Sequence, residues 1–253
     1  MQAKSELKSM IVTGASRGIG AACAVKAAQQ GFAVCVNYKA NAQAAEDVVQ
    51  EIINAGGQAI ALQADVSSEH DVSRMFATVR DQFGPVVALV NNAGILETQM
   101  RLESMTVERI RRIFATNVIG TILCAQQAIK HMAYKHGGMG GVIVNVSSVA
   151  ARLGSPREYI DYAASKGAVD TMTIGMAKEL AVDGIRVNAV RPGYIYTDMH
   201  AAGGEPNRVD RVKDLVPLKR GGTAQEVANA IMWLVSDEAS YATGTFIDVA
   251  GGN

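Results

Sequence analysis

Short apolar runs alternate with helix-compatible segments along the chain. The runs are brief and almost continuously apolar, as in strands buried on both faces of a parallel sheet. Strands are expected at residues 10–12, 33–38, 59–64, 85–90, 142–146, 185–190 and 245–249. Strand and helix in turn predict an α/β fold, a Rossmann-like doubly wound parallel sheet of about seven strands with helices on both faces.

Polar residues and glycines mark the ends of the expected helices. Ser68 and Thr223 are side chains of the N-cap type, and Gly56-Gly57 is a typical helix stop. The helices are expected to reach to about residues 30, 55, 83, 134, 182 and 235. The segment over 106–134 reads as one long helix.

No linker divides the chain, so residues 1–253 are expected to form a single domain that carries the whole site. One stretch differs in character. Residues 197–213 are polar and contain Gly203-Gly204, which makes them unsuited to a core. We expect a mobile lid there, above a ligand site.

A glycine-rich turn follows the first expected strand. It reads Thr13-Gly14-Ala15-Ser16-Arg17-Gly18-Ile19-Gly20 and enters a helix-compatible segment. Glycines let the backbone approach a ligand closely, and free N–H groups at a helix start face a phosphate. The alternative is a tight turn that binds nothing, since the spacing differs from the commoner Gly-x-Gly-x-x-Gly. We interpret the turn as a dinucleotide phosphate site.

The end of the second expected strand bears on the choice of cofactor. An acidic residue there would bond the ribose 2′-hydroxyl of NAD. The strand ends instead in Asn37-Tyr38-Lys39, without a carboxylate. Arg17 in the glycine turn is a second cation, and two cations suit a 2′-phosphate. The sequence therefore favours NADP(H) over NAD(H), against the alternative of a solvated Lys39.

Tyr162 and Lys166 are the candidate catalytic pair. Their spacing puts both side chains on one face of a helix, one turn apart. A phenol has an unperturbed pKa of about 10, and a nearby ammonium is expected to lower that pKa. Such a pair can exchange protons near neutral pH. Taken alone, the spacing also fits a solvated surface pair, so the other motifs of the chain must decide whether the pair is catalytic.

Composition excludes several classes of function. The 24 Lys and Arg balance the 24 Asp and Glu, which gives no electrostatic reason to expect nucleic acid or an anionic membrane as partner. The 3 cysteines are scattered, as buried thiols in a reducing compartment are, and no metal site is expected. The polar amino terminus has no signal-peptide core, and no run approaches the ~20 apolar residues of a membrane helix. We expect a cytoplasmic protein.

Taken in order, the motifs resemble the short-chain dehydrogenase/reductase family in its compact one-domain branch. The chain is also similar to bacterial sugar-dehydrogenase-like and 3-oxoacyl-carrier-protein-reductase-like members. The resemblance covers nearly the whole chain and rests on Thr13-Gly14-x-x-x-Gly18-Ile19-Gly20, Asp65, Asn91-Asn92-Ala93-Gly94, Asn117, Ser148, Tyr162-x-x-x-Lys166 and Pro192-Gly193-x-x-x-Thr197.

The resemblance implies a catalytic role for four residues. Tyr162 would exchange a proton with the substrate oxygen, and Lys166 would lower its pKa and bond the nicotinamide ribose. Ser148 would hold the substrate oxygen. Asn117, which is unfavourable inside a helix, would keep a water that relays protons. The family also implies a homotetramer with the two long helices at an interface.

The same resemblance implies the residues around the cofactor. Asp65 would bond the adenine, and Ile195 and Thr197 would hold the carboxamide. The other matching positions are Gly14, Ser16, Arg17, Gly18, Ile19, Gly20, Asn37, Tyr38, Lys39, Val66, Asn92, Ala93, Gly94, Tyr162, Lys166, Pro192 and Gly193.

One interval departs from the family pattern. Ser148 and Tyr162 are separated by one residue more than is usual, and the extra residue falls within 156–161, beside the substrate pocket. The departure puts the shape of the substrate in doubt. It also makes Ser147 a rival of Ser148, and Tyr159 a weaker rival of Tyr162.

The leading hypothesis is hydride transfer between NADP(H) and a secondary alcohol or ketone, with a sugar, polyol or small carbonyl compound as substrate. A 3-oxoacyl carrier protein is the alternative substrate, and it would need basic residues at the pocket mouth. Lys130, Arg152 and Arg157 could serve, although Glu158, Asp161 and Glu179 dilute them. A scaffold that senses NADP(H) without turnover is an alternative of another class. Such scaffolds commonly lose a catalytic residue, and here none is missing.

Overall fold

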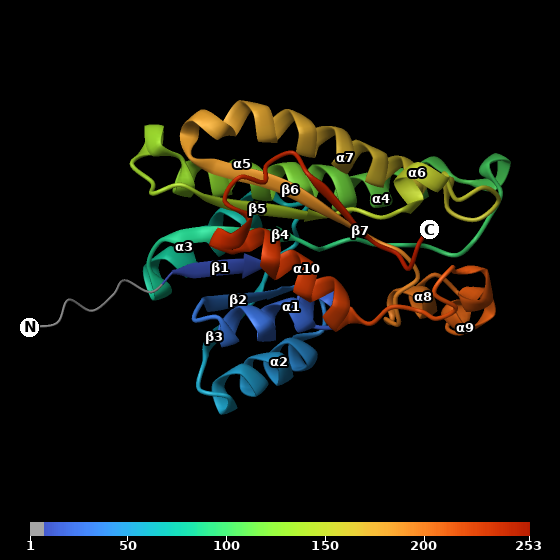
Figure 1. The fold of residues 1–253 in the computed structure, drawn as a ribbon, viewed down its shortest axis with the longest axis horizontal. Coiled ribbons are helices and arrows are strands. Elements are labelled where there is room, and N and C mark those ends of the chain that lie inside the picture. The colour runs from blue at the N-terminus through green and yellow to red at the C-terminus, as the bar shows by residue number, and fades with distance from the viewer. Residues whose placement is uncertain (1–7) are drawn as a thin grey trace, which may run out of the picture.

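A seven-stranded parallel sheet forms the centre of the computed structural model, which describes residues 8–253 (Figure 1). The strand order is β3-β2-β1-β4-β5-β6-β7, so the order of connection reverses between β1 and β4. The predicted single-domain, doubly wound fold is therefore confirmed. The strands are β1 (Ser9–Val12), β2 (Ala33–Tyr38), β3 (Gln58–Gln63), β4 (Val86–Asn91), β5 (Gly141–Val146), β6 (Ile185–Pro192) and β7 (Phe246–Val249).

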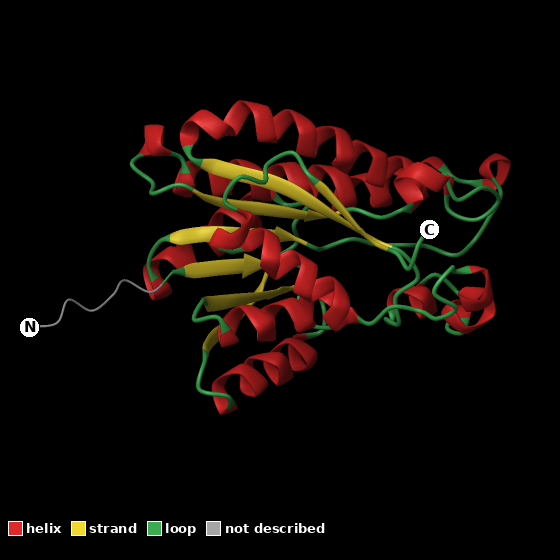
Figure 2. Cartoon of the chain, in the orientation of Figure 1, coloured by secondary structure: helices red, strands yellow, loops and turns green. Residues whose placement is uncertain are grey.

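Helices cover both faces of the sheet (Figure 2). One face carries α1 (Gly18–Gln29), α2 (Ala42–Asn54) and α10 (Ala224–Val235), and the other carries α3 (Glu69–Phe83), α5 (Gly120–Met132) and α7 (Ile160–Leu180). Met10 and Val12 of β1 pack with the first group, and Ile11 packs with the second. Burial on both faces explains why the strands are so uniformly apolar.

The predicted helix starts are confirmed at two N-caps. The Ser68 side chain accepts a hydrogen bond from the amide of Asp71 at the start of α3. Thr223 and Glu226 form a reciprocal capping box at the start of α10. Each cap satisfies amides that have no partner inside the helix.

The segment predicted as one long helix is interrupted. It consists of α4 (Val107–Phe114), a π-helical turn η2 (Ala115–Ile119) and α5. A π turn holds one residue more than an α-helical turn, and such bulges are common at functional sites. Asn117 lies inside this turn, so its unfavourable position has a structural counterpart.

Several short helices lie around this frame. The elements α6 (Ala150–Leu153), α8 (Met199–Ala202) and α9 (Arg208–Val212) gather at the carboxyl end of the strands (Figure 1). The remaining 3-10 turns are η1 (Leu102–Ser104), η3 (Tyr134–His136), η4 (Ala181–Asp183), η5 (Lys213–Leu215) and η6 (Asp237–Ala239).

Two further sequence predictions concern the core and the membrane. Cys23, Cys35 and Cys124 are free and buried, as expected. Among residues 8–253, no helix combines the length and the apolar character that crossing a bilayer requires. Residues 1–7, for which the sequence predicts no signal-peptide core, lie outside the described part of the chain.

Candidate active site

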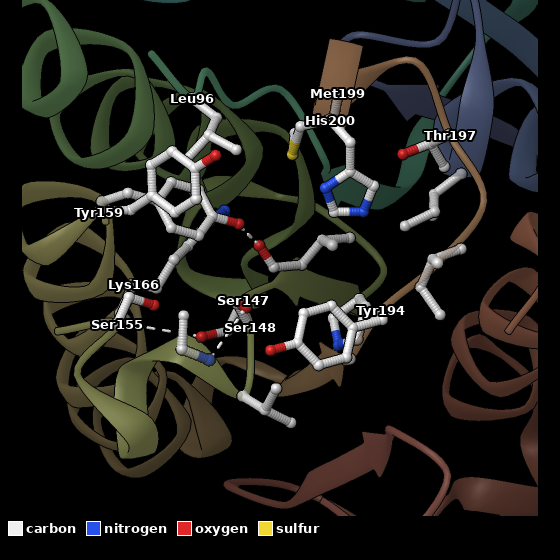
Figure 3. Close-up of a pocket in the computed structure, with 18 of the residues that line it drawn as sticks. Leu96, Ser147, Ser148, Ser155, Tyr159, Lys166, Tyr194, Thr197, Met199 and His200 are labelled. Atoms are coloured by element: carbon white, nitrogen blue, oxygen red, sulfur yellow. Dashed lines mark hydrogen bonds between the residues drawn. The ribbon is translucent and has the colours of Figure 1, made fainter. Parts of the chain in front are cut away.

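Two adjoining cavities open at the carboxyl end of the sheet. The larger has a volume of about 570 Å³, and Figure 3 shows residues that line the smaller one. Ile19, Asn92, Leu96, Thr197 and Met199 line both, so the cavities are parts of one cleft. Topology predicts a ligand at this place, where the strand order reverses.

The structure brings nearly all predicted site residues to this cleft. Those at the larger cavity are Gly14, Ser16, Arg17, Gly18, Ile19, Asn37, Tyr38, Lys39, Asp65, Val66, Asn92, Ala93, Gly94 and Thr197. Those at the smaller cavity include Ser148, Tyr162, Lys166, Pro192, Gly193 and Ile195. Gly20 and Asn117 line neither cavity. A Cβ atom on Gly20 would lie 2.5 Å from Nδ2 of Asn92, so this glycine allows the turn and the β4 loop to pack closely.

The glycine turn has the geometry of a phosphate site. Gly14 and Gly18 have φ values of +60° and +57°, which side chains disfavour. A Cβ atom on Gly14 would lie 3.0 Å from Cα of Ala93. Arg17 is the N-cap residue of α1 and makes no capping hydrogen bond through its side chain. The amides at the start of α1 therefore remain available to an anion, which fits a dinucleotide diphosphate.

The residues at the end of β2 make two kinds of contact, one with the glycine turn and one with Asp65. Asn37 is buried, its Oδ1 accepts from the Gly14 amide at 3.1 Å, and its Nδ2 donates to the Ala64 carbonyl at 3.1 Å. Its amide therefore braces the glycine turn. The Lys39 ammonium lies 2.7 Å from Oδ2 of Asp65. Burial tends to raise the pKa of Asp65, but hydrogen bonds from Lys39 and Ser67 outweigh it and lower that pKa.

Thr13 is a supporting residue to which the sequence assigned no separate role. Its Oγ1 accepts hydrogen bonds from the amides of Asn92 and Ala93, each at 3.0 Å. Asn92 in return donates to the carbonyls of Thr13 at 2.8 Å and Gly14 at 3.0 Å. These bonds hold the glycine turn against the loop after β4.

The sequence left open whether Ser147 or Ser148, and Tyr159 or Tyr162, is the catalytic residue, and hydrogen bonding distinguishes these alternatives. Ser147 is buried and donates to Oδ1 of Asp170 at 2.6 Å. Ser148 accepts from the Ala150 amide at 3.1 Å and hydrogen-bonds Tyr162. The Tyr159 hydroxyl is directed to the Gly203 carbonyl at 3.4 Å. Ser148 and Tyr162 therefore form the pair that meets in the smaller cavity.

The expected effect of Lys166 on Tyr162 is not what the structure shows. Burial raises the pKa of Tyr162 to about 12, and the hydrogen bond from Ser148 offsets this only in part. Burial also lowers the pKa of Lys166 to about 8. The Lys166 Nζ donates to the Val146 carbonyl at 2.8 Å and lies 5.6 Å from the centroid of the Tyr162 ring. The prediction of a lowered tyrosine pKa is therefore wrong for this geometry, and Tyr162 is a protonated phenol at neutral pH.

Asn117 links the loop after β4 to the catalytic helix. Its Oδ1 accepts from the Ile95 amide at 2.8 Å, and its Nδ2 donates to the Ile95 carbonyl at 3.1 Å and to Oγ of Ser165 at 3.0 Å. Ser165 donates in turn to the Tyr162 carbonyl at 2.7 Å. The buried amide thus has protein partners on both sides, and the proton-relaying water remains a prediction.

The lid segment, residues 197–213, is more tightly packed than its composition predicts. Arg208 is 5% exposed, and its guanidinium lies over the rings of Tyr159 and Tyr194, at 5.0 Å and 5.6 Å from their centroids. It pairs with Glu158 at 2.5 Å and Glu205 at 3.0 Å. The expectation that this segment is too polar for a core is therefore wrong at Arg208, because two half-buried carboxylates, 29% and 22% exposed, neutralise its buried charge.

Comparison with known proteins adds a family to this geometry. A family model described as enoyl-(acyl carrier protein) reductase matches residues 14–253. An uncharacterized oxidoreductase of Escherichia coli, YgfF, is 61% identical over 96% of this chain and 98% of its own. The 3-oxoacyl-[acyl-carrier-protein] reductase FabG of Staphylococcus epidermidis is 40% identical over 97% of this chain and 98% of its own.

Solved structures agree with the sequence relatives. A short-chain dehydrogenase from Burkholderia cenocepacia, in complex with NADP, matches with a TM-score of 0.88 and 35% identity over 97% of each chain. A substituted form of a Serratia marcescens short-chain dehydrogenase/reductase matches with a TM-score of 0.89 and 33% identity over 97% of each chain. With a matching family model, a full-length fold and a cleft that fits a dinucleotide, this chain belongs to the short-chain dehydrogenase/reductase family of NAD(P)-dependent oxidoreductases.

Proposed function

We propose that the protein transfers hydride between NADP(H) and the carbon of a secondary alcohol or ketone. The observation that carries the proposal is the meeting of Ser148 and Tyr162 in a cavity that shares its wall with the glycine-turn cavity. A ligand in each cavity would place its reacting end at that shared wall. Proximity of this kind supplies much of the acceleration in hydride transfer.

In the direction of reduction, each residue has a defined task. The reduced nicotinamide, when bound, supplies the hydride. Ser148 donates a hydrogen bond to the substrate carbonyl oxygen and stabilises the negative charge that grows there. Tyr162 is protonated at neutral pH and donates its proton to the same oxygen. Lys166 lines the same cavity and is proposed to bond the nicotinamide ribose.

We propose NADP(H) as the preferred cofactor. Arg17 and Lys39 both line the larger cavity, and the end of β2 carries no acidic residue. Lys39 pairs with Asp65 and Arg17 lies 4.0 Å from Asp198, so a 2′-phosphate would compete with two carboxylates for these cations. The NADP complex of the Burkholderia cenocepacia relative supports the same choice.

A small carbonyl compound fits the smaller cavity better than a sugar does. Leu96, Val149, Leu153 and Met199 give this cavity apolar walls. His200 adds one neutral polar group, since burial and the charge of Arg208 lower its pKa, and its Nδ1 has no hydrogen-bond partner among residues 8–253. We therefore favour an uncharged ketone that carries a second polar group.

A 3-oxoacyl carrier protein remains the second candidate, because several relatives carry the name of that reductase. The charges at the cavity mouth favour it less. Lys130 lies in the last turn of α5, at the far end of the sheet from α8 and α9 (Figure 1), so its proposed part in carrier binding is wrong. Arg152 is paired with Asp248. Of the three expected cations, the exposed Arg157 is then the one that could meet a carrier protein.

We further propose a cytoplasmic homotetramer. Exposed apolar side chains occur on the two long helical segments expected at an interface: Ile119 at the end of η2, Ile122 at the start of α5 and Ile174 on α7. Covering them with a second copy would remove apolar surface from water. Sedimentation of the purified protein measures the assembly directly.

The test is NADPH oxidation across a panel of carbonyl compounds, with Tyr162→Phe beside the wild type. The panel holds simple ketones, hydroxyketones, diketones, aldoses and short 3-oxoacyl thioesters. We expect turnover by the wild type and at least a ~10³-fold lower kcat in the variant, because the proton donor is lost. Full activity of Tyr162→Phe would refute the mechanism. Tight NADPH binding without any turnover would favour the sensing scaffold.

A further inference from the structure

The residue directly before Tyr162 takes part in a buried ion pair. The Arg109 Nε, from α4, lies 2.6 Å from Oδ2 of Asp161, and its Nη2 lies 3.3 Å from Oδ1. The two side chains are 3% and 2% exposed. Asp161 Oδ1 also accepts from the Tyr162 amide at 2.9 Å. One carboxylate therefore contacts both the arginine and the backbone of the catalytic tyrosine.

Arg109 joins three parts of the site. Beside its two bonds to Asp161, its Nη1 donates to the carbonyl of Thr98, in the segment that continues from the β4 loop. That loop contains Leu96, which lines both cavities. The guanidinium is rigid and planar, so a two-point contact fixes direction as well as distance. The pair thus sets the first turn of α7 relative to a wall of the cleft.

The start of α7 needs such support. The helix begins at Ile160, and its N-cap residue Tyr159 makes no capping hydrogen bond through its side chain. The preceding connection holds the residue that the family pattern lacks, and it is strained, with φ values of 43° at Ser155 and 68° at Arg157. The Asp161 carboxylate supplies an acceptor at this helix start, and Arg109 keeps that carboxylate in place.

Stability alone is a poor explanation for the pair. Taking two charges out of water costs about as much as their attraction returns, and apolar side chains of similar size often stabilise a protein equally well. What an apolar pair cannot provide is the fixed geometry of a bidentate contact. A catalytic proton donor depends on that kind of geometry, because a displacement of about 1 Å can cost ~10²-fold in rate.

We propose that Arg109 and Asp161 are positioning residues that fix the Tyr162 hydroxyl beside Ser148. This inference rests on the proposed function of the same site. The pair holds the start of α7 in place despite the extra residue between Ser148 and Tyr162. It acts on the residue that precedes Tyr162, whereas Lys166 follows Tyr162 in the chain.

The experiment separates geometry from stability by comparing R109M, D161L and the double variant R109M/D161L. Each single variant leaves one buried charge unpaired, so its thermal midpoint falls. The double variant removes both charges, so its midpoint recovers. If the pair positions Tyr162, kcat of the double variant stays about 30-fold below wild type. KM and the Kd for NADPH stay within about 3-fold, because the groups that bind the two ligands are untouched.

Two controls complete the design. R101M/E103L removes an exposed pair from the same region and is expected to leave kcat unchanged. R109K keeps the buried charge without the planar fork, and we expect it to fold and to lose about 10-fold in kcat. Full kcat in R109M/D161L, or in R109K where the double variant does not fold, would overturn the inference while the proposed function stands. A wild type that reduces no carbonyl compound would overturn both.

Discussion

The two cavities of the cleft are built in different ways. The cofactor cavity is shaped by backbone, with the glycine turn and the β4 loop held by short polar side chains such as Thr13 and Asn92. The substrate cavity is held by charged side chains from remote segments, as in the contact of Glu158 with Arg208. Backbone walls tolerate few changes and suit a constant ligand. Side-chain walls change with single substitutions, so we expect substrate choice to vary more easily than cofactor binding among related chains.

The largest effect should come from a side chain added to the backbone-built cavity. Gly14→Ala puts a Cβ atom 3.0 Å from Cα of Ala93, at a φ of +60°. We expect the Kd for NADPH to rise at least ~100-fold, because the turn must open. Fluorescence titration with NADPH measures it. Gly31→Ala is the matched control, with a φ of +88° and nothing within 4 Å of the added atom. It should lose about 1 kcal/mol of stability and keep its NADPH affinity, and equal losses of affinity would contradict the comparison.

An intermediate effect should come from the ion pairs that hold the lid segment. Glu158→Gln removes the carboxylate that binds Arg208 through two nitrogens, Nη1 at 3.1 Å and Nη2 at 2.5 Å. We expect KM for the carbonyl substrate to rise about 10-fold, because the charge-assisted bonds that fix Arg208 in the cavity wall are weakened. The Kd for NADPH should not change.

The control for this variant is Glu103→Gln, which removes an equivalent charge from an exposed pair with Arg101. Exposed pairs contribute little, so steady-state kinetics should show no change. A rise in the Kd for NADPH equal to the rise in KM for Glu158→Gln would mean that the two cavities are not separately supported.

The smallest effect should come from the cation at the end of β2. Lys39→Ala removes one of two positive charges proposed to meet the 2′-phosphate. We expect kcat/KM for NADPH relative to NADH to fall about 5-fold, since the side chain is largely exposed and solvent screens its charge. Lys178→Ala, on an exposed position of α7, is the control. An unchanged ratio would remove Lys39 from cofactor selection.

The sequence predicts the features that depend on local spacing and does not predict the contacts between remote segments. The strands, the glycine turn, Ser148, Tyr162 and Lys166 carry local signals, because periodicity and spacing reflect short-range geometry. Arg109 and Asp161 are 52 residues apart in the sequence, and no local pattern around either residue predicts their contact. The π turn at Asn117 is not predicted by the sequence for a related reason. A wide turn depends on hydrogen bonds to Ile95 and Ser165 that only the folded chain provides.

The pKa of Tyr162 shows the limit of spacing arguments. A lysine one turn away predicts a lowered pKa, and that holds for two solvated groups. In the folded chain both groups are desolvated, and the ammonium is directed to the Val146 carbonyl. Burial therefore dominates, and the sequence contains no measure of burial at that atom.

The wall shared by the two cavities has a consequence for how the two reactants bind. Thr197 and Met199 belong to the lid segment and line both spaces, so a molecule in one space contacts the residues that shape the other. The two binding equilibria are then coupled, and linkage requires the coupling to be equal in both directions. A dinucleotide that orders Thr197 and Met199 would raise the affinity for the second reactant by the same factor by which the second reactant raises the affinity for the dinucleotide. The two reactants should therefore bind cooperatively, each lowering the Kd of the other.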